Sequence, residues 1–334
     1  MPSRALPALC AALLLCAPAG RAYAFSASPS SVAQVVVADQ ASRRVLVLEW
    51  SEELTHRQQT QEPALVWSWT ADRAPDLADL HPEWSWTGPD EAKSRTLDGR
   101  RYLLTTASGG LAAVVDTATG RSRWAADLGR DVNPHSIELL PDGNVAVAAS
   151  AGGWVRLYAA SQGSRATAHA TFRLAGAHGV SWDERTGLLW ALGDDELTGL
   201  RVGGTPDEPT LSAVRSAPLP DRGGHDLAPV LGAPGRFWVS SLTGLWRYDP
   251  AADGFTAVRL AEPADERDVK SIGDAPGTGR LLTVRPDHRS PCDWCTSVIR
   301  LHRPEGVRTL RGAQLYKARW WPAAAAPYQM SDGR

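Results

Sequence analysis

The stretch HSIELLPDGNVAVAASAGGWVRLYAA, residues 135–160, contains the repeating unit of this chain. It opens on a histidine followed by a small residue, and the turn Pro141-Asp142-Gly143 then leads into the apolar segment VAVAAS (145–150). A turn of small residues precedes the alternating segment WVRLYA (154–159). Short apolar segments separated by Gly, Pro and Asp are typical of β-strands joined by tight turns.

The same order of signals recurs along the chain. Each repeat opens on a lysine or a histidine, and successive openings lie 42, 43, 47, 45 and 47 residues apart. An apolar strand follows the turn in each complete repeat, at 102–107, 145–150, 188–192, 237–241 and 281–284. The six opening residues are Lys93, His135, His178, His225, Lys270 and Lys317. Self-similarity at a period near 45 residues indicates a repeat architecture.

The repeat predicts an all-β fold, a six-bladed β-propeller with four-stranded blades. Four short strands in about 45 residues is the size of one blade. Five repeats are complete, and the sixth is divided between the two ends of the chain. We expect KARWW (317–321) to be its innermost strand, beside VAQVVVAD (32–39), RRVLVLEW (43–50) and ALVWSW (64–69). A two-domain sandwich is the alternative, but it explains neither the period nor the matching ends.

The ends of the chain have other compositions. Residues 1–24 combine Arg4, a short apolar run and the cleavage site Ala22-Tyr23-Ala24, which predicts a signal peptide. We therefore expect a secreted protein with one propeller domain at 25–322 and a flexible tail at 323–334. Cys292 and Cys295 are the cysteines that remain after the signal, and their spacing in an exported chain predicts a local disulfide.

Charge excludes some classes of partner. The chain has 35 basic and 37 acidic residues and a formal net charge of −2. Scattered arginines in a near-neutral chain give no basic patch for nucleic acid and no polybasic membrane anchor. We expect neither partner, and we expect a monomer.

The six opening residues are the candidate functional site. The first strand of each propeller blade lines the central channel, so equivalent positions meet around the axis. Lys93, Lys270 and Lys317 are the only lysines of the chain, which suggests binding of an anionic small molecule or an acidic saccharide. His135, His178 and His225 are candidate catalytic residues and candidate ligands of Zn²⁺ or Mn²⁺, and Tyr316 is a candidate proton donor.

The blocks VVVADQASRRVLVLEW, NPHSIELLPDGNVAVAAS, AHGVSWD and GGHDLAP resemble an uncharacterised domain-of-unknown-function family of secreted bacterial β-propellers. The resemblance covers nearly the whole mature chain. It implies a fold and an export route, but no reaction. The six-bladed lactonases hold calcium through Glu, Asn and Asp near the axis, whereas the matching positions here are Lys and His.

Three interpretations of the ring stay open. The protein is an enzyme such as an acidic-saccharide lyase, in which a cation neutralises a uronate carboxylate and His, Lys or Tyr takes the α-proton. It is a non-catalytic propeller that binds a glycan or a protein. Or the ring only lines a wet channel, with Glu91, Asp226 and Asp268 offsetting the lysines. Trp84 and Trp86 likewise either stack on sugar rings or cover a blade joint.

Overall fold

The computed structural model describes residue 1 and residues 33–50, 62–275, 277–287 and 289–322. The expected signal peptide at 1–24 and the expected tail at 323–334 lie outside the described residues. Within the described part, no helix is both long and apolar enough to cross a membrane.

Strand formation follows the repeat, as the second blade illustrates. Strand β8 (Pro134–Leu139) pairs with β9 (Val145–Ala149) in an antiparallel register that sets Leu139 opposite Val145. The turn between them needs a left-handed residue, which Gly143 supplies with φ +85°. Asp142 accepts a hydrogen bond from the backbone N–H of Asn144 at 3.0 Å and so stabilises the turn. All five residues of β9 are buried because neighbouring blades cover both faces.

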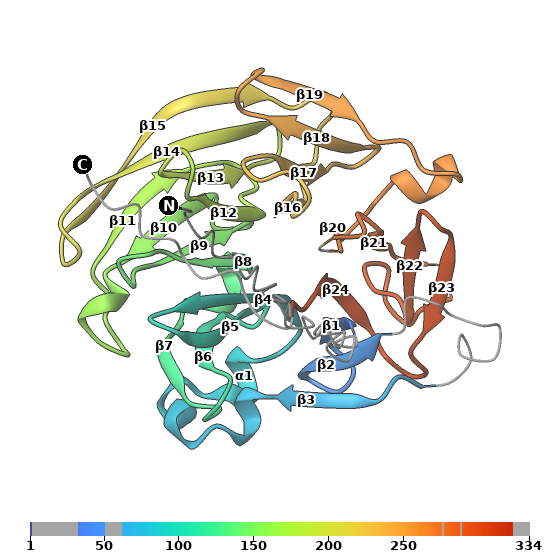
Figure 1. The fold of residues 1–334 in the computed structure, drawn as a ribbon. Coiled ribbons are helices and arrows are strands. Elements are labelled where there is room, and N and C mark those ends of the chain that lie inside the picture. Colours follow the sequence, from blue (N-terminus) through green and yellow to red (C-terminus); the bar gives the residue numbers. More distant parts are fainter. Residues whose placement is uncertain (2–32, 51–61, 276, 288, 323–334) are drawn as a thin grey trace. The chain divides into compact units, whose positions relative to one another are not determined.

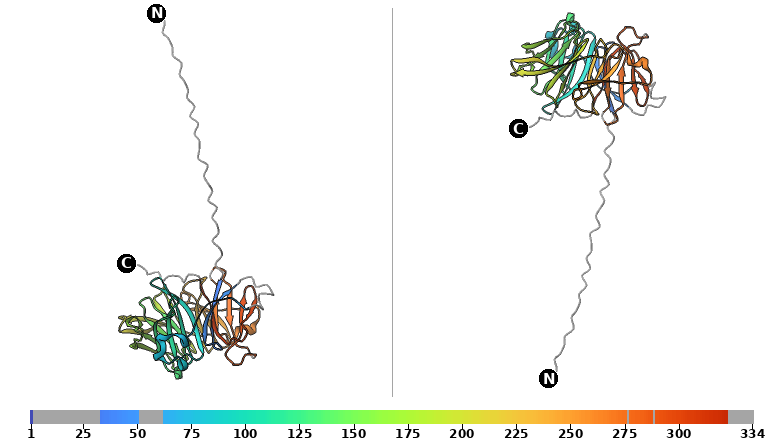
Figure 2. Two further views of the ribbon diagram at one scale, coloured as in Figure 1. Left: turned by 90° about the horizontal axis from the view of Figure 1, so that it is seen from below. Right: turned by 90° about the horizontal axis from the view of Figure 1, so that it is seen from above.

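Six antiparallel sheets of four strands form the ring (Figure 1), which confirms the expected fold. Figure 2 shows the six sheets from two sides. The strand bounds, blade by blade, are β4 (Pro89–Leu97), β5 (Arg100–Ala107), β6 (Leu111–Asp116) and β7 (Ser122–Asp127); β8, β9, β10 (Trp154–Tyr158) and β11 (His169–Arg173); β12 (Gly179–Asp183), β13 (Leu188–Leu192), β14 (Glu196–Gly204) and β15 (Pro209–Pro218); β16 (Asp226–Pro229), β17 (Phe237–Ser240), β18 (Leu245–Asp249) and β19 (Gly254–Ala257); β20 (Ser271–Asp274), β21 (Leu281–Val284), β22 (Val298–His302) and β23 (Gly306–Thr309); and β24 (Leu315–Trp320), β1 (Ala33–Asp39), β2 (Arg44–Trp50) and β3 (Leu65–Trp69).

Short helical turns occupy some of the connections. They are η1 (Ala71–Arg73), η2 (Pro75–Leu80) and α1 (Pro82–Ser85) between β3 and β4, then η3 (Arg130–Val132), η4 (Ala160–Gln162) and η5 (Pro263–Glu266).

The two ends of the chain close the ring, as expected. Strand β24 pairs antiparallel with β1, so that Arg319 lies opposite Val36 and Ala318 opposite Val37. The C-terminal strand is therefore the innermost strand of the sixth blade, and β1 to β3 complete the sheet. This pairing leaves no open sheet edge at the seam between first and last blades.

The large aromatic side chains fill the spaces between blades. Trp50, Trp124 and Trp190 lie within or at the ends of strands and are fully buried. Trp86 is buried too, donates its indole N–H to the Arg43 carbonyl at 2.9 Å and packs edge-on against Trp69. Trp86 therefore covers a blade joint, whereas Trp84 is exposed. The expected disulfide between Cys292 and Cys295 is present in the β21–β22 connection.

Candidate functional site

The first residues of the inner strands bring six polar side chains together at one end of the channel. His178, His225 and Lys270 each directly precede an inner strand and donate their backbone N–H to the adjacent strand, at 2.8–2.9 Å. His135 occupies the same level in β8, where the pairing with β9 is irregular between Pro134 and Ser136. The strand register places Asp90 of β4 and Tyr316 of β24 at the same level. We call Asp90, His135, His178, His225, Lys270 and Tyr316 the histidine ring.

The structure corrects the sequence alignment at two blades. In β4 the same irregularity falls between Pro89 and Glu91, so the counterpart of His135 is Asp90 and not Lys93. In β24 the pairing shifts between Leu315 and Ala318, which makes Tyr316 and not Lys317 the ring residue. Lys93 and Lys317 therefore lie deeper in the channel, and the expected single ring of three lysines and three histidines does not form. The irregularities of β4 and β8 fall at equivalent places, so the three-residue error at Lys93 comes from matching a lysine to a histidine across the two repeats. At Lys317 the error is one residue, where the pairing of β24 with β1 shifts.

The histidine ring is narrow. Neighbouring imidazole centroids are 4.7 Å apart for His135 and His178, and 4.8 Å apart for His178 and His225. Across the ring, Tyr316 Oη lies 3.1 Å from His225 Nε2, and Lys270 Nζ lies 3.2 Å from the same nitrogen. The Tyr316 ring also stacks on His135 at 5.5 Å. Tyr316, Lys270 and His225 therefore form one hydrogen-bonded group.

Burial keeps the imidazoles neutral. Burial, with the neighbouring charges of His178 and Lys317, holds the pKa of His135 well below its usual value. The pKa of His178 falls to about 4, again through burial. His225 has its pKa lowered strongly by burial and by Lys270. Burial also raises the pKa of Asp90 well above its ordinary value, against the hydrogen bond from Ser108 and the charge of Lys317, which lower it.

The hydrogen bonds define the tautomers. Tyr316 and Lys270 are both donors, so the neutral His225 accepts at Nε2 and has its proton on Nδ1. The buried Nδ1 atoms of His225 and His135 have no hydrogen-bond partner among the described residues. His178 differs, because its Nδ1 donates to the Gly176 carbonyl at 2.7 Å, which leaves Nε2 as an acceptor. The ring thus holds polar nitrogens whose capacity the protein does not use.

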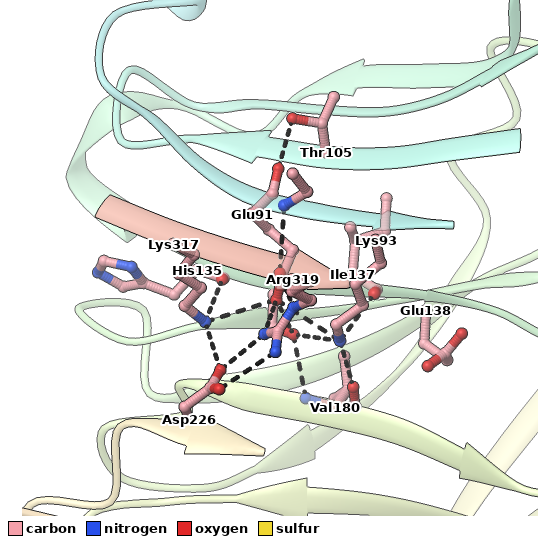
Figure 3. Close-up of polar contacts among 12 residues, drawn as sticks. Glu91, Lys93, Thr105, His135, Ile137, Glu138, Val180, Asp226, Lys317 and Arg319 are labelled. Atoms are coloured by element: carbon pink, nitrogen blue, oxygen red, sulfur yellow. Dashed lines mark hydrogen bonds and ion pairs between the residues drawn. The ribbon is translucent and has the colours of Figure 1, made fainter. Parts of the chain in front are cut away.

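One level deeper lies a cluster of charged side chains linked by ion pairs and hydrogen bonds (Figure 3). Arg319 binds two carboxylates, with Glu91 at 2.8 and 3.1 Å and Asp226 at 2.7 and 3.1 Å. Lys317 Nζ lies 3.4 Å from Glu91 and 3.1 Å from Asp226. We call Glu91, Lys93, Asp226, Lys317 and Arg319 the ion cluster. All five are buried.

Lys93 is saturated by protein acceptors. Its Nζ contacts Ser136 Oγ at 2.9 Å, the Ile137 carbonyl at 3.3 Å and the Val180 carbonyl at 2.7 Å. An ammonium has three N–H donors, and these three oxygens use them all. Burial lowers the pKa of Lys93 to about 8. Lys93 and Lys317 thus belong to the scaffold of the channel, and Lys270 is the one lysine placed to meet a ligand.

Opposing effects set the charges of the cluster. Burial alone would raise the pKa of Glu91, but Arg319, Lys317 and Lys93 outweigh it and hold this pKa well below its usual range. Asp226 has its pKa lowered in the same way, by Arg319 and Lys317. Both carboxylates are therefore ionised and match most of the positive charge around them.

The three histidines do not fit the expected Zn²⁺ or Mn²⁺ site. Among the described residues, no group of three or more His, Cys, Asp or Glu side chains has the arrangement to hold a metal ion. His135 and His178 stack with their planes at 23° instead of converging on a point, and His225 Nε2 is already taken by two donors. We derive no chemistry from a metal here.

Beyond the ion cluster, a cavity of about 90 Å³ opens at the other end of the channel. Its lining includes Lys93 and Arg319 together with apolar residues such as Leu231 and Trp320. The charged lining residues are already paired within the protein, so the unused polar groups lie at the histidine ring.

Sequence reasoning missed several residues of the site. Arg319 could not be distinguished from the many other arginines of the chain. Asp90 stands three residues before Lys93, the residue predicted to open that repeat. Asn133, whose side-chain amide contacts His135 Nε2 at 2.9 Å, was not among the predicted site residues. The Pro89-Asp90 and Pro134-His135 pairs contain the one signal that would have aligned the two blades correctly.

Comparisons with known proteins place the chain in a family. The model of a family described as "Family of unknown function (DUF6528)" matches residues 28–331. No curated protein matches the sequence. A solved protein of unknown function from Bacteroides caccae is 13% identical, with a TM-score of 0.48, over 78% of this chain and 85% of that one.

Two other solved structures show likeness of the same degree. Virginiamycin B lyase from Staphylococcus aureus is 11% identical over 67% of this chain and 85% of that chain, with a TM-score of 0.46. A functionally unknown protein from Desulfotomaculum acetoxidans is 10% identical over 89% and 84%, with a TM-score of 0.48. Likeness at this level carries no conclusion about activity or ligand.

Proposed function

This chain belongs to DUF6528, a family of unknown function, and we propose that it is an exported propeller that binds a small anion, such as a carboxylate, in the histidine ring. The ligand approaches from the end of the channel at which His178, His225 and Lys270 are partly exposed. The ion cluster closes the channel behind it.

One observation carries the proposal: Lys270 and two histidines offer unused N–H donors in the same ring. Lys270 Nζ donates to His225 and has further protons to give. The Nδ1 atoms of His135 and His225 are buried without a partner, a state that costs free energy unless a ligand accepts their hydrogen bonds. Burial lowers the pKa of the three imidazoles and raises the pKa of Asp90, so Lys270 is the main source of positive charge in the ring.

The pairing of His225 with Tyr316 favours one reaction, β-elimination on an acidic saccharide. When Lys270 turns to the uronate carboxylate and Tyr316 to the leaving oxygen, Nε2 of the neutral His225 becomes free to take the proton α to the carboxylate. The electron pair of that C–H bond forms the new double bond as the glycosidic C–O bond breaks. Tyr316 gives its proton to the leaving oxygen, while Lys270 stabilises the charge that develops on the carboxylate. Burial and the charge of Asp90 raise the pKa of Tyr316 well above its usual value, so the hydroxyl keeps its proton until the leaving oxygen needs it.

Calorimetric titration with acetate, sulfate and galacturonate tests the binding proposal. Lys270→Met should abolish anion binding, whereas Arg201→Met removes a positive charge from an exposed position on β14 and should bind as the parent does. Equal binding by parent and Lys270→Met would reject the proposal, and so would a parent that binds none of these anions.

The reaction needs a separate test. Incubation of the protein with uronate polymers should give unsaturated products that absorb in the ultraviolet, and His225→Gln should lose at least about a hundredfold in rate. A parent that binds uronates but forms no such product is a binding protein, and the elimination proposal then fails while the binding proposal stands.

A further inference from the structure

Two exposed tryptophans lie on the rim that surrounds the histidine ring. All 14 tryptophans fall within the described residues, and only Trp84 and Trp294 are largely exposed, by 73% and 52%. Trp84 belongs to α1, in the connection that leads to Asp90 in β4. Trp294 lies in the connection from β21 to β22, where Thr296 pairs with Leu315, the residue directly before Tyr316. Both tryptophans are thus at the ring end of the channel.

Trp294 is held rigidly despite its exposure. The disulfide between Cys292 and Cys295 closes the short loop that contains it. Its indole Nε1 donates a hydrogen bond to Gln40 Oε1 at 2.9 Å, which fixes the plane of the ring. A fixed aromatic face loses little conformational entropy when a ligand packs on it.

Gln40 connects this tryptophan to the histidine ring. Its Nε2 donates to Asp90 Oδ1 at 3.2 Å, and Asp90 lies 3.9 Å from His135 Nδ1. Two hydrogen bonds through Gln40 therefore connect the Trp294 side chain to Asp90 of the histidine ring. Trp294 lies on the side of the ring where Tyr316 stands between Lys270 and Asp90.

We propose that Trp294 is the platform of a saccharide subsite, on which the apolar face of a uronic acid packs while the carboxylate of the ligand binds Lys270. The inference rests on the anion site proposed above and names its ligand class. An inorganic anion has no apolar face that could pack on an exposed indole. A purely apolar ligand has no group that could accept hydrogen bonds from the histidine ring. A sugar with an apolar face and a carboxylate matches both.

Titrations with three probes test the subsite: a galacturonate trisaccharide, the neutral trisaccharide maltotriose, and acetate. In the parent we expect the uronate to bind more tightly than acetate and maltotriose to bind weakly. Trp294→Ala should weaken the uronate roughly tenfold and leave acetate within about twofold, because only the packing contact is lost. Trp294→Phe keeps an apolar face and should retain most of the affinity.

Each outcome separates this inference from the proposal on which it rests. Val214→Ala, a truncation of an exposed side chain on the outer strand β15, is the matched control and should change nothing. Unchanged uronate affinity in Trp294→Ala, with loss in Lys270→Met, overturns the platform and leaves the anion site intact. Acetate binding without any uronate binding in the parent overturns the saccharide class alone. A parent that binds no anion overturns both.

Discussion

Arg319 is the residue that best explains how a channel lined by cations is stable. Its guanidinium satisfies Glu91 and Asp226 from opposite sides, and each carboxylate also faces Lys317. Three cations and two carboxylates in the ion cluster leave a small excess of positive charge, which extra hydrogen bonds from Lys93 to backbone carbonyls help to accommodate. The positive charge expected to attract a ligand is thus mostly neutralised inside the protein.

Glu91→Gln should therefore destabilise the protein by about 3–5 kcal/mol. It removes the carboxylate that Lys93, Lys317 and Arg319 share and leaves Lys317 and Arg319 to pair with Asp226. Urea unfolding followed by tryptophan fluorescence measures the loss. Glu83→Gln, at an exposed glutamate, is the control and should stay within about 1 kcal/mol of the parent. A loss as small as the control's would show that Glu91 does not anchor the cluster.

Acid should weaken the fold through the histidine ring. The pKa of His178 is about 4 in the folded protein, below the ordinary value of 6.5, so the unfolded chain binds more protons between these values. Stability should be constant with respect to this group above pH 6.5 and should fall by roughly 3 kcal/mol as the pH drops to 4. His135 and His225 add to the slope, since their pKa values are also lowered.

His178→Gln isolates this contribution. The variant has no imidazole at this position, so its unfolding free energy should fall less steeply than that of the parent between pH 6.5 and 4. Chemical denaturation at a series of pH values gives both slopes. Identical slopes would show that His178 is not buried in its neutral form.

At the scale of elements, we expect the disulfide hairpin between β21 and β22 to contribute more to the proposed saccharide subsite than to the stability of the fold. A bridge between residues three positions apart constrains only a short loop, so we expect its loss to cost no more than about 2 kcal/mol. The Cys292→Ser, Cys295→Ser double variant should therefore melt close to the parent but lose affinity for the uronate trisaccharide, as Trp294 is no longer held. Reduction of the disulfide in the parent should lower its affinity for the uronate trisaccharide to that of the double variant. A large loss of stability with unchanged affinity would assign the bridge to the fold.

The whole ring depends on the pairing of β24 with β1. Truncation after residue 314 removes the innermost strand of the sixth blade together with Lys317 and Arg319. The truncated chain should lose cooperative unfolding and expose apolar surface, because β1 becomes an open edge and the ion cluster is broken. Truncation after residue 322 retains every described strand and should unfold as the full chain does. Circular dichroism and urea titration compare the three proteins, and cooperative unfolding of the shorter form would contradict this role of β24.

Much of the architecture was predictable because strand patterns and turn residues are local properties. The repeat period predicted the number of blades, and the apolar segment at 32–39 together with KARWW predicted the closure between β1 and β24. The same holds for Cys292 and Cys295, whose spacing permits few partners. Four members of the histidine ring, His135, His178, His225 and Lys270, were also identified in this way.

By itself, the sequence determined the blade, the number of blades and the four ring positions at which the repeat is regular. Only the tertiary structure decided that Asp90 and Tyr316 complete the ring, and that Lys93 and Lys317 lie buried among carboxylates and carbonyls. The physical reason is that the spacing of strands and turns does not specify which residue of an inner strand lies at a given depth. Matching Lys93 to His135 was wrong by three residues, and the irregular pairing of β24 puts Tyr316 at the ring and Lys317 below it. The partners of a buried cation come from other blades, as Asp226 does for Arg319 over 93 residues of sequence.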